Sequence, residues 1–265
     1  MKQTGIIRKM RSVQGKPVTY ELPLGDELFP VQKALGKILS LKYLGKIHCI
    51  RCGRKTRKSF NQGYCYPCFQ NAPENSECII KPELCRAHEG EARDMEWARG
   101  HCLQEHVVYL AISSGVKVGV TRKSQVPTRW IDQGAHQALQ LARTPNRYTA
   151  GLIEVELKQH ENDRTDWRKM LKNEYPDDVD LREVKKELVA KLPKELSQYV
   201  VKDTRRTAIE FPVLEYPTKV KSVGFDKEAE IAGKLLGIKG QYLIFEGDRV
   251  INMRKHQGYE VEAEL

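Results

Sequence analysis

Two pairs of cysteines constrain this chain more than any other feature of its 265 residues. The sequence reads Cys49-Ile-Arg-Cys52 and, after twelve further residues, Cys65-Tyr-Pro-Cys68. Each CxxC pair forms a tight turn that directs two thiolates at one point, and four thiolates complete a tetrahedral zinc shell. The spacing therefore predicts a closed structural zinc site held by Cys49, Cys52, Cys65 and Cys68. The alternative is an iron–sulfur cluster, because thiolates alone do not select the metal.

A second group of cysteines and histidines follows with less regular spacing. It comprises Cys78, Cys85, His88, His101 and Cys102. Three cysteines and one histidine are a common zinc ligand set, and we expect Cys78, Cys85, His88 and Cys102 to form it. The alternative is that these cysteines are small buried side chains in a loop-rich segment.

The charge of the chain is unevenly distributed. Residues 1–60 hold 14 basic and 3 acidic residues, a net of +11, and residues 107–150 hold 6 and 1, a net of +5. Two basic surfaces of this kind favour a polyanionic partner, most simply nucleic acid, either DNA or RNA. The densest basic run begins inside the first cysteine motif, and its cations are Arg51, Arg54, Lys55, Arg57 and Lys58.

Aromatic residues flank the second cysteine pair: Tyr64, Tyr66 and Phe69. Cations beside aromatic rings on a rigid metal loop suit phosphate contact together with base stacking. The rings are equally suited to form the small core of the metal loop, and the sequence leaves both readings open.

The apolar runs are too short for a membrane span. The longest, Val107 to Val116, has ten residues and includes Ser113, Ser114 and Gly115, whereas a spanning helix needs about 20 apolar residues. The first eight residues also lack the apolar stretch of a secretory signal. We therefore expect a cytoplasmic protein whose cysteines bind metal and do not form disulfides.

The central segment carries a recognisable order of elements. Residues 107–121 contain two runs of β-branched residues around a Ser-Ser-Gly turn, which predicts a β-hairpin. We expect a helix from about Pro127 to Ala142, a third strand over 151–158 and a helix over 163–172. The expected first helix carries a polar stripe of Arg129, Gln133, His136 and Gln140.

Hairpin, helix, strand and helix in this order resemble the GIY-YIG nuclease superfamily over residues 107–172. Val107-Val108-Tyr109 stands at the first motif of that family, and Lys117-Val118-Gly119-Val120-Thr121 at the second. The resemblance implies that Tyr109 is an active-site tyrosine, that Arg129 stabilises phosphoryl charge and that Gly119 lets the backbone approach the site.

This chain departs from the family pattern at two places. Lys117 replaces the second tyrosine, so the resemblance implies an altered nuclease site. The metal-holding glutamate of the family lies on the helix after the third strand, where Asp163 and Asp166 are the available carboxylates for magnesium. We expect Tyr109, Lys117 and Arg129 to converge on one pocket. Arg122, Lys123, Gln133 and His136 are the further nucleic-acid contacts that we expect in this segment.

The layout of most of the chain also resembles an uncharacterised family of bacterial cysteine-rich proteins, a domain of unknown function. The residues that carry this resemblance are the cysteine pairs and the later stretch Thr128-Arg-Trp-Ile-Asp-Gln-Gly-Ala135. It implies a bacterial cytosolic protein and supplies no activity.

The expected fold class is α+β, with five segments. They are an N-terminal β-unit (1–47), a cysteine-rich zinc region (48–106), a GIY-YIG-like α/β domain (107–175), a helical spacer or covering helix (176–210) and a C-terminal antiparallel β-unit (211–265). Residues 36–42 and 233–239 have similar sequences, so the two terminal β-units are candidates to pack together.

These observations favour a zinc-containing nucleic-acid-binding protein with an altered nuclease site. The first alternative is an active phosphodiesterase or nucleic-acid-modifying enzyme that uses Tyr109, Lys117 and Arg129, and magnesium if it is a nuclease. The second is a zinc-stabilised interaction scaffold.

Overall fold

The computed structural model describes residues 1–159 and 166–265, and its chain divides into two compact units. Unit 1 comprises 1–70, 131–134 and 209–265, and unit 2 comprises 71–130 and 135–208. The class is α+β, as predicted. The expected zinc region 48–106 is shared between the units, because its first four cysteines lie in unit 1 and its last three in unit 2.

Unit 1 is built mainly of antiparallel strands. One sheet has the order β1-β15-β5-β12-β13-β14-β11, with β6 paired to β5, and a smaller sheet has the order β2-β3-β4. The strands are β1 (Lys2–Ile6), β2 (Arg11–Val13), β3 (Thr19–Leu24), β4 (Glu27–Phe29), β5 (Ile38–His48), β6 (Lys55–Thr56), β11 (Lys221–Ser222), β12 (Glu230–Lys239), β13 (Tyr242–Phe245), β14 (Arg249–Asn252) and β15 (Tyr259–Glu264). The short helix α1 (Tyr66–Asn71) follows the second cysteine pair.

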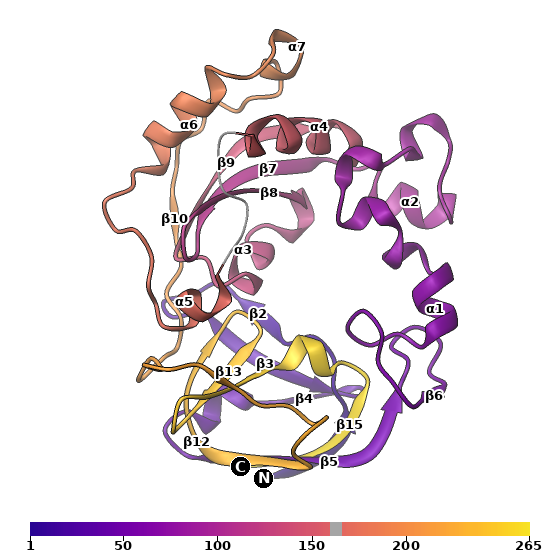
Figure 1. Ribbon diagram of the computed structural model, residues 1–265, viewed down its shortest axis with the longest axis vertical. Coiled ribbons are helices and arrows are strands. Elements are labelled where there is room, and N and C mark those ends of the chain that lie inside the picture. The colour runs from indigo at the N-terminus through magenta and orange to yellow at the C-terminus, as the bar shows by residue number, and fades with distance from the viewer. Residues whose placement is uncertain (160–165) are drawn as a thin grey trace. The chain divides into compact units, whose positions relative to one another are not determined.

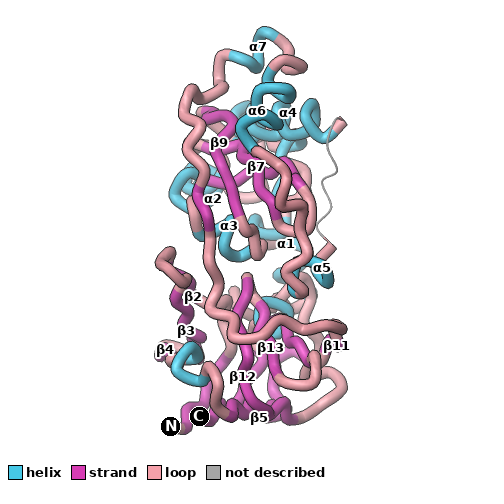
Figure 2. Tube along the Cα trace, turned by 90° about the vertical axis from the view of Figure 1, so that its left-hand side faces the viewer, coloured by secondary structure: helices cyan, strands magenta, loops and turns pink. Residues whose placement is uncertain are grey.

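The two ends of the chain share the large sheet of unit 1. β5 pairs with β12, which places Leu39 opposite Gly233, and β1 pairs with β15, which places Lys2 opposite Glu264. Figure 2 shows both termini beside β5. The similar segments 36–42 and 233–239 thus contribute to neighbouring antiparallel strands.

Unit 2 contains a four-stranded antiparallel sheet of order β10-β9-β7-β8 and most of the helices. In Figure 1, α4 and α6 lie on one side of β7, β8 and β9, and α3 lies on the other. The strands are β7 (His106–Ile112), β8 (Val116–Arg122), β9 (Gln137–Thr144) and β10 (Thr207–Ala208). The helices are α2 (Met95–His101), α3 (Thr128–Asp132, whose last two residues count with unit 1), α4 (Arg147–Lys158), α5 (Trp167–Leu171), α6 (Leu181–Val189) and α7 (Lys194–Ser197).

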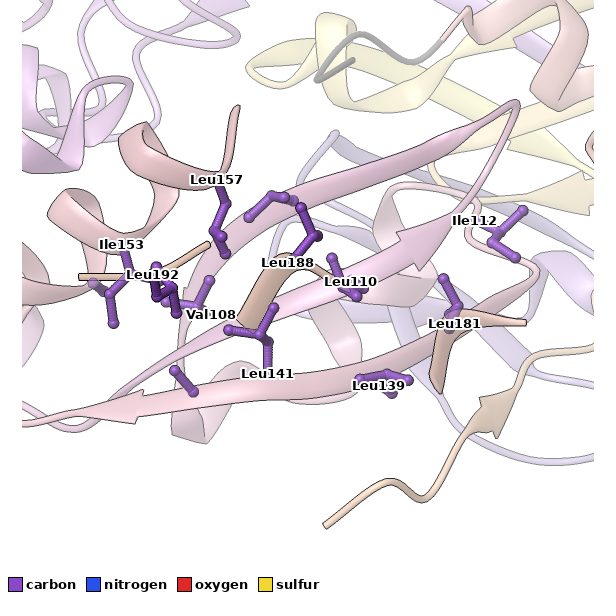
Figure 3. Packing of buried hydrophobic residues seen from close by; sticks show 13 residues of the cluster. Val108, Leu110, Ile112, Leu139, Leu141, Ile153, Leu157, Leu181, Leu188 and Leu192 are labelled. Carbon is purple, nitrogen blue, oxygen red and sulfur yellow. The ribbon is translucent and has the colours of Figure 1, made fainter. Parts of the chain in front are cut away.

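The core of unit 2 lies between its sheet and the helices α4 and α6 (Figure 3). Alternate residues of β7 point into it, because successive side chains of a strand face opposite sides. Its largest contributors are Val108, Leu110, Leu139, Leu141, Ile153, Leu157, Leu181 and Leu188, all at most 1% exposed. Segment 176–210 is therefore a covering layer, since Leu181 and Leu188 of α6 are part of the core.

The hairpin predicted over 107–121 is present as β7 and β8. The next two predictions are wrong. The expected helix 127–142 ends at Asp132, where Gly134 adopts φ +66°, and residues 137–144 form β9 against β7. The expected strand 151–158 is the helix α4, which Asn146 caps by accepting a hydrogen bond from the Thr149 amide at 2.9 Å. Tertiary pairing with β7 thus overrides the high helix propensity of the Ala and Leu residues in β9.

The expected helix 163–172 is partly described. α5 covers Trp167–Leu171. Asp166 caps its N-terminus, because the Asp166 carboxylate accepts hydrogen bonds from the Arg168 and Lys169 amides. Asp163, one of the two candidate magnesium ligands, lies outside the described residues.

Candidate functional site

The first cysteine group is assembled by the end of β5 and the loop that follows it. The ligand atoms of Cys49, Cys52, Cys65 and Cys68 all lie within 4.8 Å of one another. The amide of Gly53 donates to the Cys49 carbonyl at 2.9 Å, and Gly53 adopts φ +73°, a conformation that favours glycine. The tight turn predicted for this pair is thereby formed.

The spacing of the sulfurs suits a single metal ion. The Sγ atoms of Cys52 and Cys65 are 3.7 Å apart. A tetrahedral ion with metal–sulfur bonds of about 2.3 Å requires sulfurs roughly 3.8 Å apart. Burial opposes ionisation of Cys49, but hydrogen bonds from the Cys52, Cys65 and Arg51 amides outweigh it and lower the pKa of this thiol. The group can therefore hold a metal ion through four thiolates.

The five predicted cations of this loop are all exposed, and they lie beside a cluster of rings. Phe60 stacks on Phe69 with a centroid distance of 5.9 Å, and it contacts Tyr66 at 5.3 Å. Tyr66 is 52% exposed and Phe69 38%. The Lys58 ammonium lies 5.4 Å from the centroid of Phe60. The exposed cations are Arg51, Arg54, Lys55, Arg57 and Lys58.

A cavity of about 600 Å³ adjoins the same loop. Lys46 of β5 and Lys55 of β6 line it together with Tyr43 and Arg57. Three cations around one tyrosine create a recess suited to an anionic group and a planar ring. Cations, exposed rings and the cavity all belong to unit 1.

The second cysteine group lies in unit 2 and brings together Cys78, Cys85 and Cys102, whose sulfurs are within 4.8 Å of one another. Arg147 at the start of α4 holds the segments that carry them. Its guanidinium donates to the carbonyls of Cys78 (2.7 Å) and Ile79 (2.9 Å), and its amide donates to the Cys102 carbonyl (2.8 Å). This role of Arg147 was not predicted, because it depends on contacts with residues far away in the sequence.

His88, the predicted fourth ligand, is not gathered with these three thiols. Its ring stacks on Tyr148 at a centroid distance of 4.3 Å, and its Nε2 is 3.9 Å from a carboxylate oxygen of Glu89. His101 stacks on Trp97 and contacts the Trp97 carbonyl through Nδ1 at 2.9 Å. Both imidazoles thus pack against aromatic rings, that of His88 on Tyr148 and that of His101 on Trp97, and neither is grouped with the three thiols.

The GIY-YIG-like residues lie on the sheet of unit 2. Tyr109 pairs with Gly119 and Lys117 with Ala111, so Tyr109 and Lys117 are diagonal neighbours on one face. Tyr109 is fully buried, and the Trp130 ring from α3 lies 5.9 Å from it. A Cβ on Gly119 would stand 2.6 Å from the Tyr109 hydroxyl oxygen, so this glycine makes room for the tyrosine. Lys117 is 8% exposed.

The predicted polar stripe is wrong, because its residues do not share a helix. Arg129 belongs to α3, Gln133 follows that helix, and Gln140 lies in β9. His136 stacks on Tyr175 with centroids 4.1 Å apart.

The two basic residues after β8 have local partners. Arg122 is half-buried and donates to the Gly100 carbonyl at 3.5 Å. The Lys123 ammonium pairs with Glu105 at 2.8 Å.

The helix after the third strand is α4, and its buried carboxylate is Glu154, which lies 3.5 Å from the Lys158 ammonium. α4 packs on the face of the sheet opposite to Tyr109. Asp166, the described candidate for magnesium, caps α5 and does not lie on α4, and Glu154 lies on the helix across the sheet from the tyrosine.

Within residues 1–159 and 166–265, every helix falls short of the length and apolar character that crossing a bilayer requires. No curated protein and no solved structure matches this chain in the comparisons. A family model described as a protein of unknown function, DUF2797, matches residues 36–261. That match covers most of the chain, and the protein belongs to the DUF2797 family.

Proposed function

We propose that this protein binds nucleic acid through the zinc-stabilised loop that carries Cys49, Cys52, Cys65 and Cys68. The observation that carries the proposal is the set of five exposed cations beside two exposed rings on one metal-binding loop. Exposed cations contact phosphates, and exposed rings stack on bases that are not paired. Single-stranded RNA or DNA is the substrate class that uses both features.

Zinc is the metal that we propose for both cysteine groups. Thiolate ligands suit zinc and iron–sulfur clusters. In the first group all four sulfurs lie within 4.8 Å of one another, which supports one tetrahedral ion, because a cluster of several irons spreads its four cysteine ligands farther apart. All seven cysteines are free thiols, which supports a reducing compartment, and we propose the cytoplasm of a bacterium.

Fluorescence anisotropy with labelled single strands and duplexes tests this function. Zinc-loaded protein should bind single strands more tightly than duplexes of the same sequence. Replacing both exposed rings, Tyr66→Ala with Phe69→Ala, should weaken the binding of single strands but not that of duplexes. Base–aromatic stacking contributes about 1–3 kcal/mol per base, or about 5-fold to 150-fold in affinity. Ring variants that retain zinc and bind single strands as tightly as the original protein would refute the stacking role.

A GIY-YIG-like phosphodiesterase is the second candidate. The order β7, β8, α3, β9 and α4 supports it, because hairpin, helix, strand and helix follow one another as in that superfamily, although the third strand is residues 137–144 and residues 151–158 are helical. A lysine buried next to Tyr109 on one sheet face supports it too, since a lysine ammonium binds phosphate as a point charge. Incubation of labelled strands with magnesium tests it. Cleavage that Lys117→Ala or Arg129→Ala abolishes in folded protein would support a nuclease, and intact strands would exclude one.

A further inference from the structure

One buried histidine of unit 2 has an unused ring nitrogen. His106 opens β7 and is fully buried. Its Nδ1 lies 2.7 Å from the Gln104 carbonyl oxygen. A carbonyl only accepts hydrogen bonds, so Nδ1 carries the proton and Nε2 presents a lone pair. Across the described residues, this buried Nε2 finds no hydrogen-bond partner. A buried polar atom without a partner requires an explanation, and a role in binding a metal ion is one of them.

The backbone places His106 next to the second cysteine group. It follows Cys102 by four residues, and its strand register sets it opposite Thr144. Three residues beyond Thr144, the Arg147 amide holds the Cys102 carbonyl. Burial lowers the pKa of His106 to about 4, so the imidazole is neutral and its Nε2 lone pair is free to bind a metal ion near neutral pH. The chain path thus places His106 beside the segment that carries Cys102.

We propose that His106, through Nε2, is the fourth ligand of a zinc ion held by Cys78, Cys85 and Cys102. Three cysteines and one histidine form a closed structural site. A histidine that binds metal through one nitrogen almost always donates its other N–H to a carbonyl or carboxylate, which is the contact that His106 makes with Gln104.

Closing this site requires that the thiols and the His106 imidazole move together. The three sulfurs lie within 4.8 Å of one another, and the imidazole is outside that group. Cys78 and Cys85 lie in or beside single 3₁₀ turns, whereas His106 is held in the sheet by β8 and β9. The turns are the parts that can shift, so we expect the ion to draw the thiolates to the strand.

The charge balance fits this ligand set. Zinc with three thiolates and a neutral imidazole carries one negative charge. The Arg147 guanidinium donates to the Cys78 and Ile79 carbonyls, and the Arg122 guanidinium donates to the Gly100 carbonyl, two residues before Cys102. Two arginines therefore stand near enough to compensate a net negative metal site.

Two other fourth ligands compete with His106. One is His88, which the sequence suggested and whose ring stacks on Tyr148. The other is water, because the three cysteines line a cavity of about 470 Å³. The three ligands can be distinguished by spectroscopy. With His88 as the ligand, the metal would couple to the His88 ring, and with water as the ligand it would couple to no imidazole.

Cadmium-113 substitution of the full chain distinguishes the three ligands. Proton–cadmium correlation spectra should connect one of about two cadmium resonances to the ring protons of His106. His106→Ala should reduce the zinc content from about two ions per chain to about one, and the matched control His88→Ala should leave about two. His106→Cys should restore the second ion and move its cadmium resonance, because a thiolate replaces the nitrogen.

Coupling of the metal to His88, or a metal with three thiolates and no coupled imidazole, would overturn the proposal. The unsubstituted protein gives this answer even if the alanine variant fails to fold. The readout is metal ligation in unit 2, so it does not depend on whether the basic loop of unit 1 binds nucleic acid.

Discussion

Removing four cations from the first metal loop should change how nucleic-acid binding responds to salt. The change is Arg54→Ala, Lys55→Ala, Arg57→Ala and Lys58→Ala in one protein. All four side chains are exposed and none of them is a metal ligand. The metal site should therefore survive, and the variant should contain the same amount of zinc as the original protein.

The expected magnitude follows from counting phosphate contacts. Each cation that neutralises a phosphate contributes about 0.7 to the log–log salt slope for single strands and about 0.9 for duplexes. If every one of the four contacts a phosphate, the slope becomes shallower by about 2.8 to 3.6. Raising the salt from about 50 mM to about 200 mM should then weaken nucleic-acid binding by the original protein about 50-fold to 150-fold more than binding by the variant.

Anisotropy titrations at several salt concentrations measure this slope. A matched control replaces Lys186, Lys191, Lys194 and Lys202 of unit 2, which are also exposed, with alanine. This control changes the net charge equally, so a general charge effect would shift both variants. Equal slopes for the two variants, or an unchanged slope for the loop variant, would refute a phosphate-binding role for the loop.

Three further predictions concern the metal, the sheet and the pH dependence of stability. Cys65→Ser should lose the metal ion of the first site and unfold its loop, which elemental analysis and proteolysis measure; retained metal would contradict the four-thiolate assignment. Gly119→Ala should lower the free energy of unfolding by about 1–3 kcal/mol because its Cβ would overlap the buried Tyr109, whereas Gly115→Ala, with no atom within 4 Å, is the control in urea denaturation. Burial lowers the pKa of Lys239 to about 8 from 10.5, so the unfolded chain binds more protons between these values and stability should rise with pH across that window. Urea titrations at pH 8 and pH 10.5 should show that the free energy of unfolding of the original protein rises by about 3 kcal/mol relative to that of Lys239→Met. Parallel pH profiles of the two proteins would disprove this role of Lys239.

The parts of the fold with local signals could be predicted from the sequence. The alternating β-branched residues and the Ser-Ser-Gly turn identify the hairpin of β7 and β8, since both signals act within a few residues. The spacing of Cys49, Cys52, Cys65 and Cys68 identifies a cysteine cluster, because each pair needs only a tight turn.

Predictions failed where distant contacts decide the structure. Residues 137–144 are rich in alanine, leucine and glutamine, which favour a helix, yet pairing with β7 makes them a strand. Residues 151–158 alternate like a strand, but Ala150, Ile153 and Leu157 also follow helical spacing and pack as a helix face on the sheet. The cap at Asn146 was the local signal that could have separated these alternatives.

The candidate site shows the same division. His106 precedes the β-branched run and shares its inward face with Val108 and Leu110, so it is a polar residue in an apolar position. That is a readable sequence signal for a buried functional group. Its proximity to the cysteines could not be predicted from the sequence, because it depends on the pairing of β9 with β7 and on the contact of Arg147 with Cys102.

The discontinuous make-up of unit 1 has a consequence for the order in which the chain can fold. β5 needs β12 and β15 as its neighbours, and almost 200 residues of sequence separate β5 from β12. During synthesis, β1 and β5 must remain with unpaired edges until β12 and β15 emerge, whereas β7, β8 and β9 of unit 2 lie close together in sequence. Unpaired edges are templates for aggregation. The basic residues crowded into the first 60 positions would keep such nascent chains apart by mutual repulsion until β12 and β15 arrive.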